Sequence, residues 1–262
     1  MNPFEKLDNK AGFRNKVVKQ EMGLHCDKCG RDYDYYEFDN GQVIKDGCDC
    51  DMIALAKQKT EEFKKRQQRN KANAIFNKSI INDDLADATF DNYIPTSQSL
   101  EKAKALLERY ATNFKLDNKQ SILLYGSYGT GKSHLSMATI KRVREKGFSV
   151  LYMNVPQLIT TYKSTYNKNA TLTERELDQI IADVDLLVLD DYGTALSNFG
   201  IQKMFEVMES RTGKHNIITT NNSSKELIQN KDLAKIFSRM MKNTTPINMN
   251  GEDYRMRGIN FW

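Results

Sequence analysis

Residues 126–133 form a complete phosphate-binding loop, and this motif constrains the chain more than any other feature. The loop reads Gly126-Ser127-Tyr128-Gly129-Thr130-Gly131-Lys132-Ser133. An apolar run at 121–125 precedes it as a buried strand would, and a helix-forming run at 134–146 follows it. This order lets glycines fold backbone N–H groups around phosphates and directs the positive end of a helix at them. A glycine-rich turn that binds nothing needs neither flanking element, so the motif predicts an ATP or GTP site.

The loop residues have separate expected tasks. Lys132 is expected to reach the β- and γ-phosphates and to act in catalysis, and the Ser133 hydroxyl is expected to hold Mg²⁺. The remaining residues that we expect to contact the nucleotide are Gly126, Gly129, Thr130, Gly131 and His134.

The composition is that of an ordinary soluble protein. The 262 residues suffice for one large domain and one small one, and 28% of them are charged. A net charge of +5 permits nucleic-acid binding without requiring it. Residues 1–10 lack the apolar run of a signal peptide, and no apolar run approaches the ~20 residues of a membrane span. We therefore expect a cytoplasmic protein with no membrane partner.

All four cysteines lie within the first fifty residues, in the two pairs Cys26/Cys29 and Cys48/Cys50. Between the pairs, an Asn-Gly turn at 40–41 separates two strand-like runs. Disulfides are disfavoured in a reducing compartment, whereas four thiolates give Zn²⁺ a closed tetrahedral shell. The arrangement predicts a zinc ribbon.

The second cysteine pair leaves alternatives to this interpretation. It is C-x-C rather than C-x-x-C, which makes the zinc signature less specific. His25 could replace one thiolate, or the four thiols could be free and structural. A catalytic cysteine is disfavoured because no βαβ pattern surrounds the C-x-x-C.

The chain divides into three predicted segments: a zinc-binding domain at 1–53, a basic helical linker at 54–88 and an ATPase domain at 89–262. Between residues 54 and 78 the linker has eight Lys or Arg and two Glu, with neither Pro nor Gly. This pattern predicts a solvated helix. It is either a soluble spacer or a basic arm that contacts nucleic acid or an acidic partner.

In the third segment, strand-like and helix-like runs alternate, which predicts an α/β fold with a parallel sheet flanked by helices. Besides the strand before the phosphate-binding loop, the expected strands are 148–153, 185–190 and 216–220. The expected helices are 155–166, 173–184, 200–211 and 231–242.

Two carboxylates follow the apolar run 186–189, which reads as a strand buried on both faces. Ligands of α/β folds bind where parallel strands end. Asp190 is expected to hold Mg²⁺, and Asp191 is expected to orient and deprotonate the attacking water. The alternative is that both acids only cap a helix.

Two further residues complete the predicted ATPase site. Asn221 ends the strand-like run 216–220 and is placed to hydrogen-bond the attacking water or the γ-phosphate. Arg239 lies on the last long helix and is predicted to reach the γ-phosphate of a neighbouring subunit as an arginine finger. The alternative for Arg239 is a plain surface arginine.

Together, these motifs resemble those of an AAA+ ATPase, and the finer resemblance is to replicative helicase loaders of the DnaC/DnaI type from bacteria and phages. Residues 88–93, 189–193 and 251–255 resemble the nucleotide-base region, the acidic motif and the terminal tail of these loaders. The cysteine-rich segment is similar to the zinc-binding, helicase-contacting domain of the DnaI branch. The resemblance covers most of residues 20–257.

The resemblance implies an ATP-dependent loader that grips a replicative DNA helicase through its N-terminal domain. The AAA+ domain would bind ATP, Mg²⁺ and single-stranded DNA, and would assemble as a homo-oligomer on the helicase. ATP hydrolysis would be slow, because aspartate stands at 191 where glutamate is usual, and would depend on assembly. Too few residues follow Arg239 for a helical lid, so the lid is expected to be absent or vestigial, with Arg255 or Arg257 as a remnant sensor.

Residues 155–166 occupy the place of the loader family's DNA-contacting helix. Tyr162 and Tyr166 are spaced i, i+4, and Lys163 lies beside them, so these three residues are predicted to contact single-stranded DNA. Core packing of the tyrosine pair is the alternative.

Two rival functions are open. One is a transposition-targeting ATPase of the IstB type, which has a similar ATPase core and lacks the cysteine cluster. The other is a nucleotide-binding decoy that occupies a helicase or a loader without turnover. The intact set of Lys132, Asp190, Asp191 and Asn221 argues against a decoy.

Overall fold

The computed structural model describes residues 16–79, 83–193 and 196–256. The chain forms two compact units, Met1–Arg66 and Gln67–Trp262, and the division falls inside helix α2 (Cys50–Ser79). The last turns of α2 belong to the second unit, because Ala72 is buried in its core and Arg69 donates a 2.5 Å hydrogen bond to the Gly147 carbonyl. The scheme based on sequence, by contrast, treated 54–88 as one separate linker.

The first unit is built on an antiparallel sheet of β1 (Val17–His25), β2 (Asp32–Phe38) and β3 (Val43–Asp46). The turn between β2 and β3 is closed by Asn40, whose Oδ1 accepts a 2.9 Å hydrogen bond from the Gln42 N–H. Among the described residues of this unit, 16–66, Cys48 is the one buried side chain. The sheet therefore has almost no apolar core of its own.

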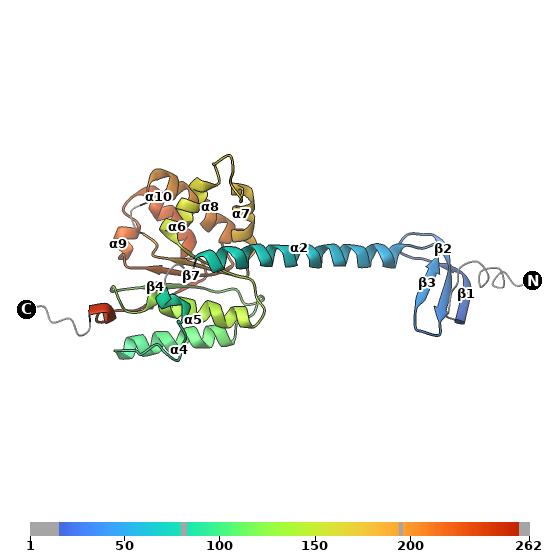
Figure 1. Ribbon diagram of the computed structural model, residues 1–262, viewed down its shortest axis with the longest axis horizontal. Coiled ribbons are helices and arrows are strands. Elements are labelled where there is room, and N and C mark those ends of the chain that lie inside the picture. The colour runs from blue at the N-terminus through green and yellow to red at the C-terminus, as the bar shows by residue number, and fades with distance from the viewer. Residues whose placement is uncertain (1–15, 80–82, 194–195, 257–262) are drawn as a thin grey trace, which may run out of the picture. The chain divides into compact units, whose positions relative to one another are not determined.

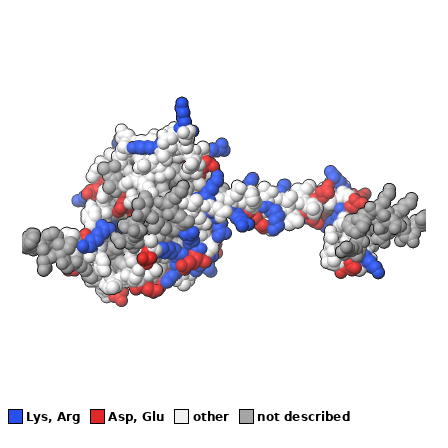
Figure 2. Space-filling view, viewed as in Figure 1, with Lys and Arg blue, Asp and Glu red and all other residues white. Residues whose placement is uncertain are grey.

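Within the same unit, the first part of α2 is exposed on all sides. Figure 2 shows lysine and arginine side chains along this helix. Lys59 forms an ion pair with Glu62, whereas Lys57, Lys64, Lys65 and Arg66 are exposed without an ion pair to any described residue. The solvated basic helix expected from the sequence is present over these residues.

The second unit contains a five-stranded parallel sheet in the order β5-β6-β7-β4-β8, which confirms the predicted fold class. Its strands are β4 (Ser121–Tyr125), β5 (Val150–Asn154), β6 (Leu186–Asp190), β7 (His215–Thr220) and β8 (Thr244–Asn248). Every residue of β6 and β7 is buried, as expected of central strands covered on both faces.

Helices cover both faces of this sheet (Figure 1). One face packs against α4 (Gln98–Thr112) and α5 (Lys132–Glu145). The other face packs against α6 (Val155–Ser164), α7 (Glu174–Asp183), α8 (Asn198–Arg211) and α10 (Lys231–Met240). Two short helices, α3 (Asp83–Ala86) and α9 (Ser224–Leu227), complete the set in the described residues.

After α10, residues 241–256 form β8 and the 3₁₀ turn η1 (Tyr254–Met256), and no helical bundle. Residues 241–256 thus contain no helical lid. No helix among the described residues is both long and apolar enough to cross a membrane.

Candidate functional site

The phosphate-binding loop connects β4 to α5, and its lysine is folded back onto the loop. Lys132 Nζ donates hydrogen bonds to the carbonyls of Gly126 at 3.0 Å and Ser127 at 2.5 Å. Burial of this ammonium lowers the pKa of Lys132 to about 8. A buried cation that has only neutral carbonyls as hydrogen-bond acceptors is well placed to bind an anion such as a phosphate.

The segment that follows β8 lies directly against the loop. Asn250 Oδ1 accepts a 3.0 Å hydrogen bond from the Ser127 N–H, and the Tyr254 N–H donates to the Gly129 carbonyl at 3.0 Å. A Cβ atom at Gly126 would lie 2.7 Å from the Met249 carbonyl, so a side chain has no room there. Glycine at 126 therefore allows both the backbone conformation of the loop and the close approach of residues 249–250.

Residues 89–93 form the other wall of the loop. Tyr93 Oη donates to the Thr130 carbonyl at 2.7 Å, and His134 Nε2 donates to the Thr89 carbonyl at 2.8 Å. The Tyr93 and His134 rings lie 5.5 Å apart between centroids. His134 is thus positioned by the segment expected to contact the nucleotide base.

Asp190, at the end of β6, lies beside the loop. Its Oδ1 accepts a 3.0 Å hydrogen bond from Ser133 Oγ, so the two residues predicted to hold Mg²⁺ are in direct contact. Thr219 donates to the same oxygen and Tyr152 donates to Oδ2, each at 2.6 Å. The carboxylate is buried and oriented by three hydroxyl groups.

Asp191 follows in a strained backbone conformation, with φ of 56°. Asp191 Oδ2 accepts a 3.0 Å hydrogen bond from Asn154 Nδ2, and the Asp191 N–H donates to Thr219 Oγ1 at 2.9 Å. Burial and the charge of Asp190 raise the pKa of Asp191 above the usual aspartate value. The two acids thus lie in different environments at the same sheet edge.

Asn221 follows β7 at this edge and lines a cavity of about 640 Å³. Gly126, Ser127 and Asn250 also line the cavity, together with apolar residues such as Phe237. Asn221 Oδ1 is buried, and no described residue donates a hydrogen bond to it. Because an unpaired buried acceptor is costly, this oxygen is a ready partner for a donor such as water.

This geometry is that of a nucleotide site, and a family comparison names the nucleotide. Residues 51–260, most of the chain, match the family described as "IstB-like ATP binding protein". The chain belongs to the IstB-like ATP-binding protein family. ATP is therefore the ligand that this family assigns to the phosphate-binding loop.

Individual curated proteins are also similar to this IstB-like chain. The replicative helicase loader DnaC of Buchnera aphidicola subsp. Baizongia pistaciae is 31% identical over 139 residues, 53% of this chain and 56% of that protein. A protein of Pseudomonas aeruginosa named "Insertion sequence IS21 putative ATP-binding protein" is 28% identical over 148 residues, 54% of this chain and 55% of that protein. The chain thus spans about half the length of these curated relatives.

Among solved structures, the crystal structure of the DnaC helicase loader has the same fold as the second unit. The TM-score is 0.56 at 24% sequence identity, and the match covers 64% of this chain and 99% of that chain. The resemblance to loaders of the DnaC/DnaI type that the sequence predicted is confirmed by the family match, by curated relatives named as DnaC and by the shared fold.

The residues of the IstB-like site also suit Mg²⁺. Hydroxyl and carboxylate oxygens are the ligands that this hard cation prefers, and Ser133 Oγ and Asp190 Oδ1 supply one of each. When bound with ATP, Mg²⁺ neutralises charge on the phosphates.

Arg239 lies on α10 and contacts α8. Its Nε forms an ion pair with Glu209, and its guanidinium carbon lies 4.2 Å from the centroid of the Phe205 ring. Its side chain is 30% exposed. The described contacts therefore hold Arg239 at the surface of its own subunit.

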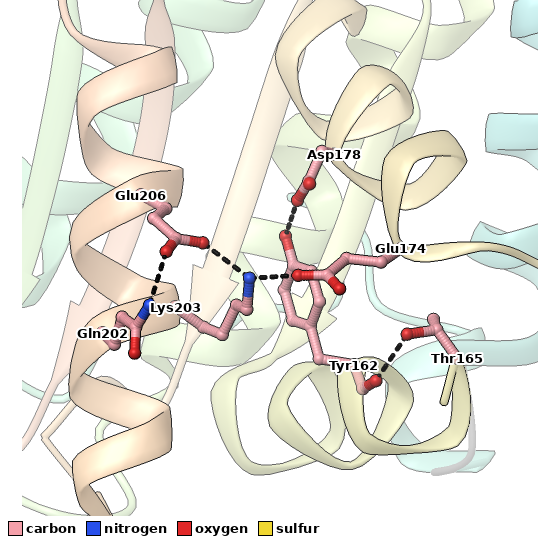
Figure 3. A network of polar contacts seen from close by, with 7 residues as sticks. All are labelled: Tyr162, Thr165, Glu174, Asp178, Gln202, Lys203 and Glu206. Atoms are coloured by element: carbon pink, nitrogen blue, oxygen red, sulfur yellow. Dashed lines mark hydrogen bonds and ion pairs between the residues drawn. The ribbon is translucent and has the colours of Figure 1, made fainter. Parts of the chain in front are cut away.

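The structure contradicts the predicted DNA contact of Tyr162. The ring is fully buried, and its Oη donates a 2.7 Å hydrogen bond to Asp178. The Lys203 ammonium lies 5.3 Å from the ring centroid and forms ion pairs with Glu174 and Glu206 (Figure 3). A ring enclosed by α6, α7 and α8 cannot stack on a base, so Tyr162 belongs to the core.

The two other predicted DNA contacts are accessible. Tyr166 lies just beyond the end of α6 and is 60% exposed, with its ring edge-to-face against Phe199. Lys163 is exposed as well. Of the two arginines considered as sensors, Arg255 lies in η1, close enough to Lys132 and Asp191 to influence the pKa of each, and Arg257 lies outside the described residues.

The four cysteines of the first unit form one cluster. Their Sγ atoms all lie within 4.8 Å of one another, with Cys29 and Cys48 3.8 Å apart and Cys26 and Cys50 4.0 Å apart. A tetrahedron of thiolates around Zn²⁺ has edges of about 3.8 Å, so the cluster fits this ion. His25 contributes no ligand atom to the cluster and instead contacts Asp32 at 2.9 Å.

Several residues that shape this site were not predicted from the sequence. Asn154, Tyr152, Thr219 and Asn250 each contact a predicted site residue through a hydrogen bond. Asn154 alone carries a weak signal, because it is a polar residue at the end of a strand that the sequence predicts.

Proposed function

We propose that this chain is an ATP-dependent loader of a replicative DNA helicase. The observation that carries the proposal is the similarity of its ATPase unit to proteins named as replicative helicase loaders. In this proposal, the zinc ribbon binds the helicase and the ATPase unit binds ATP and single-stranded DNA. The ribbon cysteines at 26–50 precede the family match, which starts at residue 51, so the ribbon is an addition to the shared ATPase core.

The ATPase chemistry follows from the sheet edge. Lys132 binds the β- and γ-phosphates, and Ser133 and Asp190 hold Mg²⁺. Asp191 orients and deprotonates the attacking water, while the unpaired Asn221 oxygen accepts a hydrogen bond from that water. Hydrolysis is slow until subunits assemble, because Lys132 and Mg²⁺ then act without the additional arginine that stabilises the charge developing on the γ-phosphate.

Arg239 of a neighbouring subunit supplies that cation in the proposed homo-oligomer. Arg239→Ala is expected to bind ATP normally and to lose hydrolysis that depends on assembly, by a factor of about 10³ or more. Mixing Arg239→Ala with Asp191→Asn subunits should restore phosphate release, since the second variant keeps its arginine.

Lys235→Ala is the control for Arg239, because Lys235 is a cation one turn earlier on the same helix whose exposed ammonium forms an ion pair with Asp232. It should leave assembly-dependent hydrolysis unchanged. Wild-type hydrolysis by Arg239→Ala alone would make this residue a surface arginine.

Single-stranded DNA is proposed to contact the exposed Tyr166 and Lys163. Aromatic rings stack on bases, and lysines neutralise phosphates. The exposed basic residues of α2 offer a second source of phosphate contacts, which would make binding weaker at high salt.

The deciding experiment is a pull-down with the replicative helicase of the source organism, with and without ATP. We expect full-length protein and residues 1–66 to retain the helicase, and residues 67–262 to bind ATP and DNA only. The second fragment begins at 67 rather than 80, because Ala72 is part of the ATPase core. Helicase retention by 67–262 alone would reverse the roles of the two units.

Transposition targeting is the second candidate, favoured by the family description and by the IS21 relative. Retention of a transposase, and not of the helicase, in the corresponding pull-down would support this function. A nucleotide-binding decoy would instead retain the helicase and release no phosphate from ATP, even in the assembled state.

A further inference from the structure

Two buried hydroxyl groups that have so far been given no role in the site hold the carboxylate of Asp190. Tyr152 Oη donates to its Oδ2 and Thr219 Oγ1 to its Oδ1, each at 2.6 Å. Tyr152 lies on β5 and Thr219 on β7, and these are the two neighbours of β6 in the sheet. The acid at the end of β6 is therefore held from both sides by residues that are almost fully buried.

Thr219 contacts the second acid as well. The Asp191 N–H donates a 2.9 Å hydrogen bond to Thr219 Oγ1. The positive φ of Asp191 is uncommon for a residue other than glycine and persists only where neighbouring groups support it. One hydroxyl thus links the orientation of the Asp190 carboxylate to the backbone of Asp191.

The third hydroxyl on Asp190 belongs to Ser133. In the proposed ATPase site, Ser133 is itself a ligand of Mg²⁺, so it is not a fixed support for the carboxylate. We assign neither Tyr152 nor Thr219 as a ligand of Mg²⁺. Partners of this kind, which hold a metal-binding carboxylate from behind, set its direction and its affinity for the ion.

We propose that Thr219 and Tyr152 are positioning residues that hold Asp190 in the orientation that binds Mg²⁺ together with ATP. Thr219 additionally fixes Asp191, the residue assigned to the attacking water. The proposal rests on the proposed ATPase site and adds the roles of these two hydroxyl groups to it.

The test is the Mg²⁺ requirement for binding of a fluorescent ATP analogue, mant-ATP, by the full-length chain. Thr219→Val removes the hydroxyl and keeps the branched shape. It should raise the Mg²⁺ concentration needed for half-maximal binding by about 10- to 100-fold. Tyr152→Phe should show the same effect near the lower end of this range. Thr219→Ser keeps a hydroxyl and should restore a requirement close to that of the wild type.

Thr220→Val is the matched control. Thr220 is the next residue and equally buried, but its hydroxyl donates to the Tyr192 carbonyl at 2.7 Å and contacts neither acid. Its Mg²⁺ requirement should equal that of the wild type, which separates positioning of the carboxylate from a general loss of packing.

Each outcome decides the matter. A wild-type Mg²⁺ requirement in folded Thr219→Val overturns the role of Thr219. If Thr219→Val shows no cooperative thermal transition and is therefore unfolded, Tyr152→Phe is the variant that tests the proposal. A Mg²⁺ requirement of Tyr152→Phe equal to that of the wild type then overturns the proposal. If the wild type binds mant-ATP equally well with and without Mg²⁺, the proposed Mg²⁺ site of the ATPase is refuted. The positioning role of both hydroxyl groups is then refuted as well.

Discussion

Lys132→Ala is expected to abolish ATP hydrolysis and to weaken ATP binding about a hundred-fold or more. The ammonium is buried in the loop and has only neutral carbonyl oxygens as hydrogen-bond acceptors, so its full charge is available to the phosphates. Loss of one partner of a buried charge-assisted contact costs about 2–5 kcal/mol. Calorimetric titration with ATP and Mg²⁺, together with phosphate release, measures both effects. Unchanged ATP affinity would show that the nucleotide binds elsewhere.

Asp191→Asn is the contrasting variant. The change keeps the size of the side chain and removes only the carboxylate, and Asp191 has no assigned contact with the phosphates. ATP binding should stay within about threefold of the wild type, while phosphate release should stop, which is the pattern of a group needed only in the transition state. Turnover at the wild-type rate would refute the role of Asp191.

Cys48→Ser is expected to remove the zinc ion and to unfold the sheet of the first unit. The described residues of that unit bury one side chain, Cys48 itself, so burial of apolar surface contributes little to its stability. Structural zinc contributes about 10–16 kcal/mol in small domains. Elemental analysis should find one zinc ion per wild-type chain and none in the variant. Circular dichroism of residues 1–66 should show loss of the strands.

His25→Ala is the control for the zinc site. His25 precedes Cys26 in the sequence, but its ring contacts Asp32 and contributes no atom to the cluster of thiols. The variant should keep its zinc. A wild-type protein that is folded, reduced and free of metal would contradict the zinc ribbon.

The alternating pattern of the second unit predicted four of the five strands of its sheet, because its central strands are continuous apolar runs. The run predicted at 185–190 is β6 at Leu186–Asp190, and the run at 216–220 is most of β7. β8 was missed because it is an edge strand that contains Pro246 and mostly polar residues. β1 was missed because two irregularities interrupt its pairing with β2, and no alternation is left to recognise.

The candidate site was predictable where it lies within single motifs. Lys132, Ser133 and Asp190 are recognisable from local sequence, whereas Thr219 and Tyr152 reach Asp190 only through the order of the strands. Tyr162 shows that local spacing can also predict a contact that the fold excludes. An i, i+4 spacing is the same on a buried and an exposed helix face, and the partners that bury this ring come from α7 and α8.

The order of the strands also sets when the nucleotide site can form during synthesis on the ribosome. β4 is the first strand of the large sheet to be translated, yet its neighbours β7 and β8 are the last. β5 and β6 are neighbours and can pair early, while β4 waits for most of the unit to emerge. Asn250, which holds Ser127, leaves the ribosome later still. The contacts that hold the phosphate-binding loop are thus complete only after residues up to Asn250 have emerged.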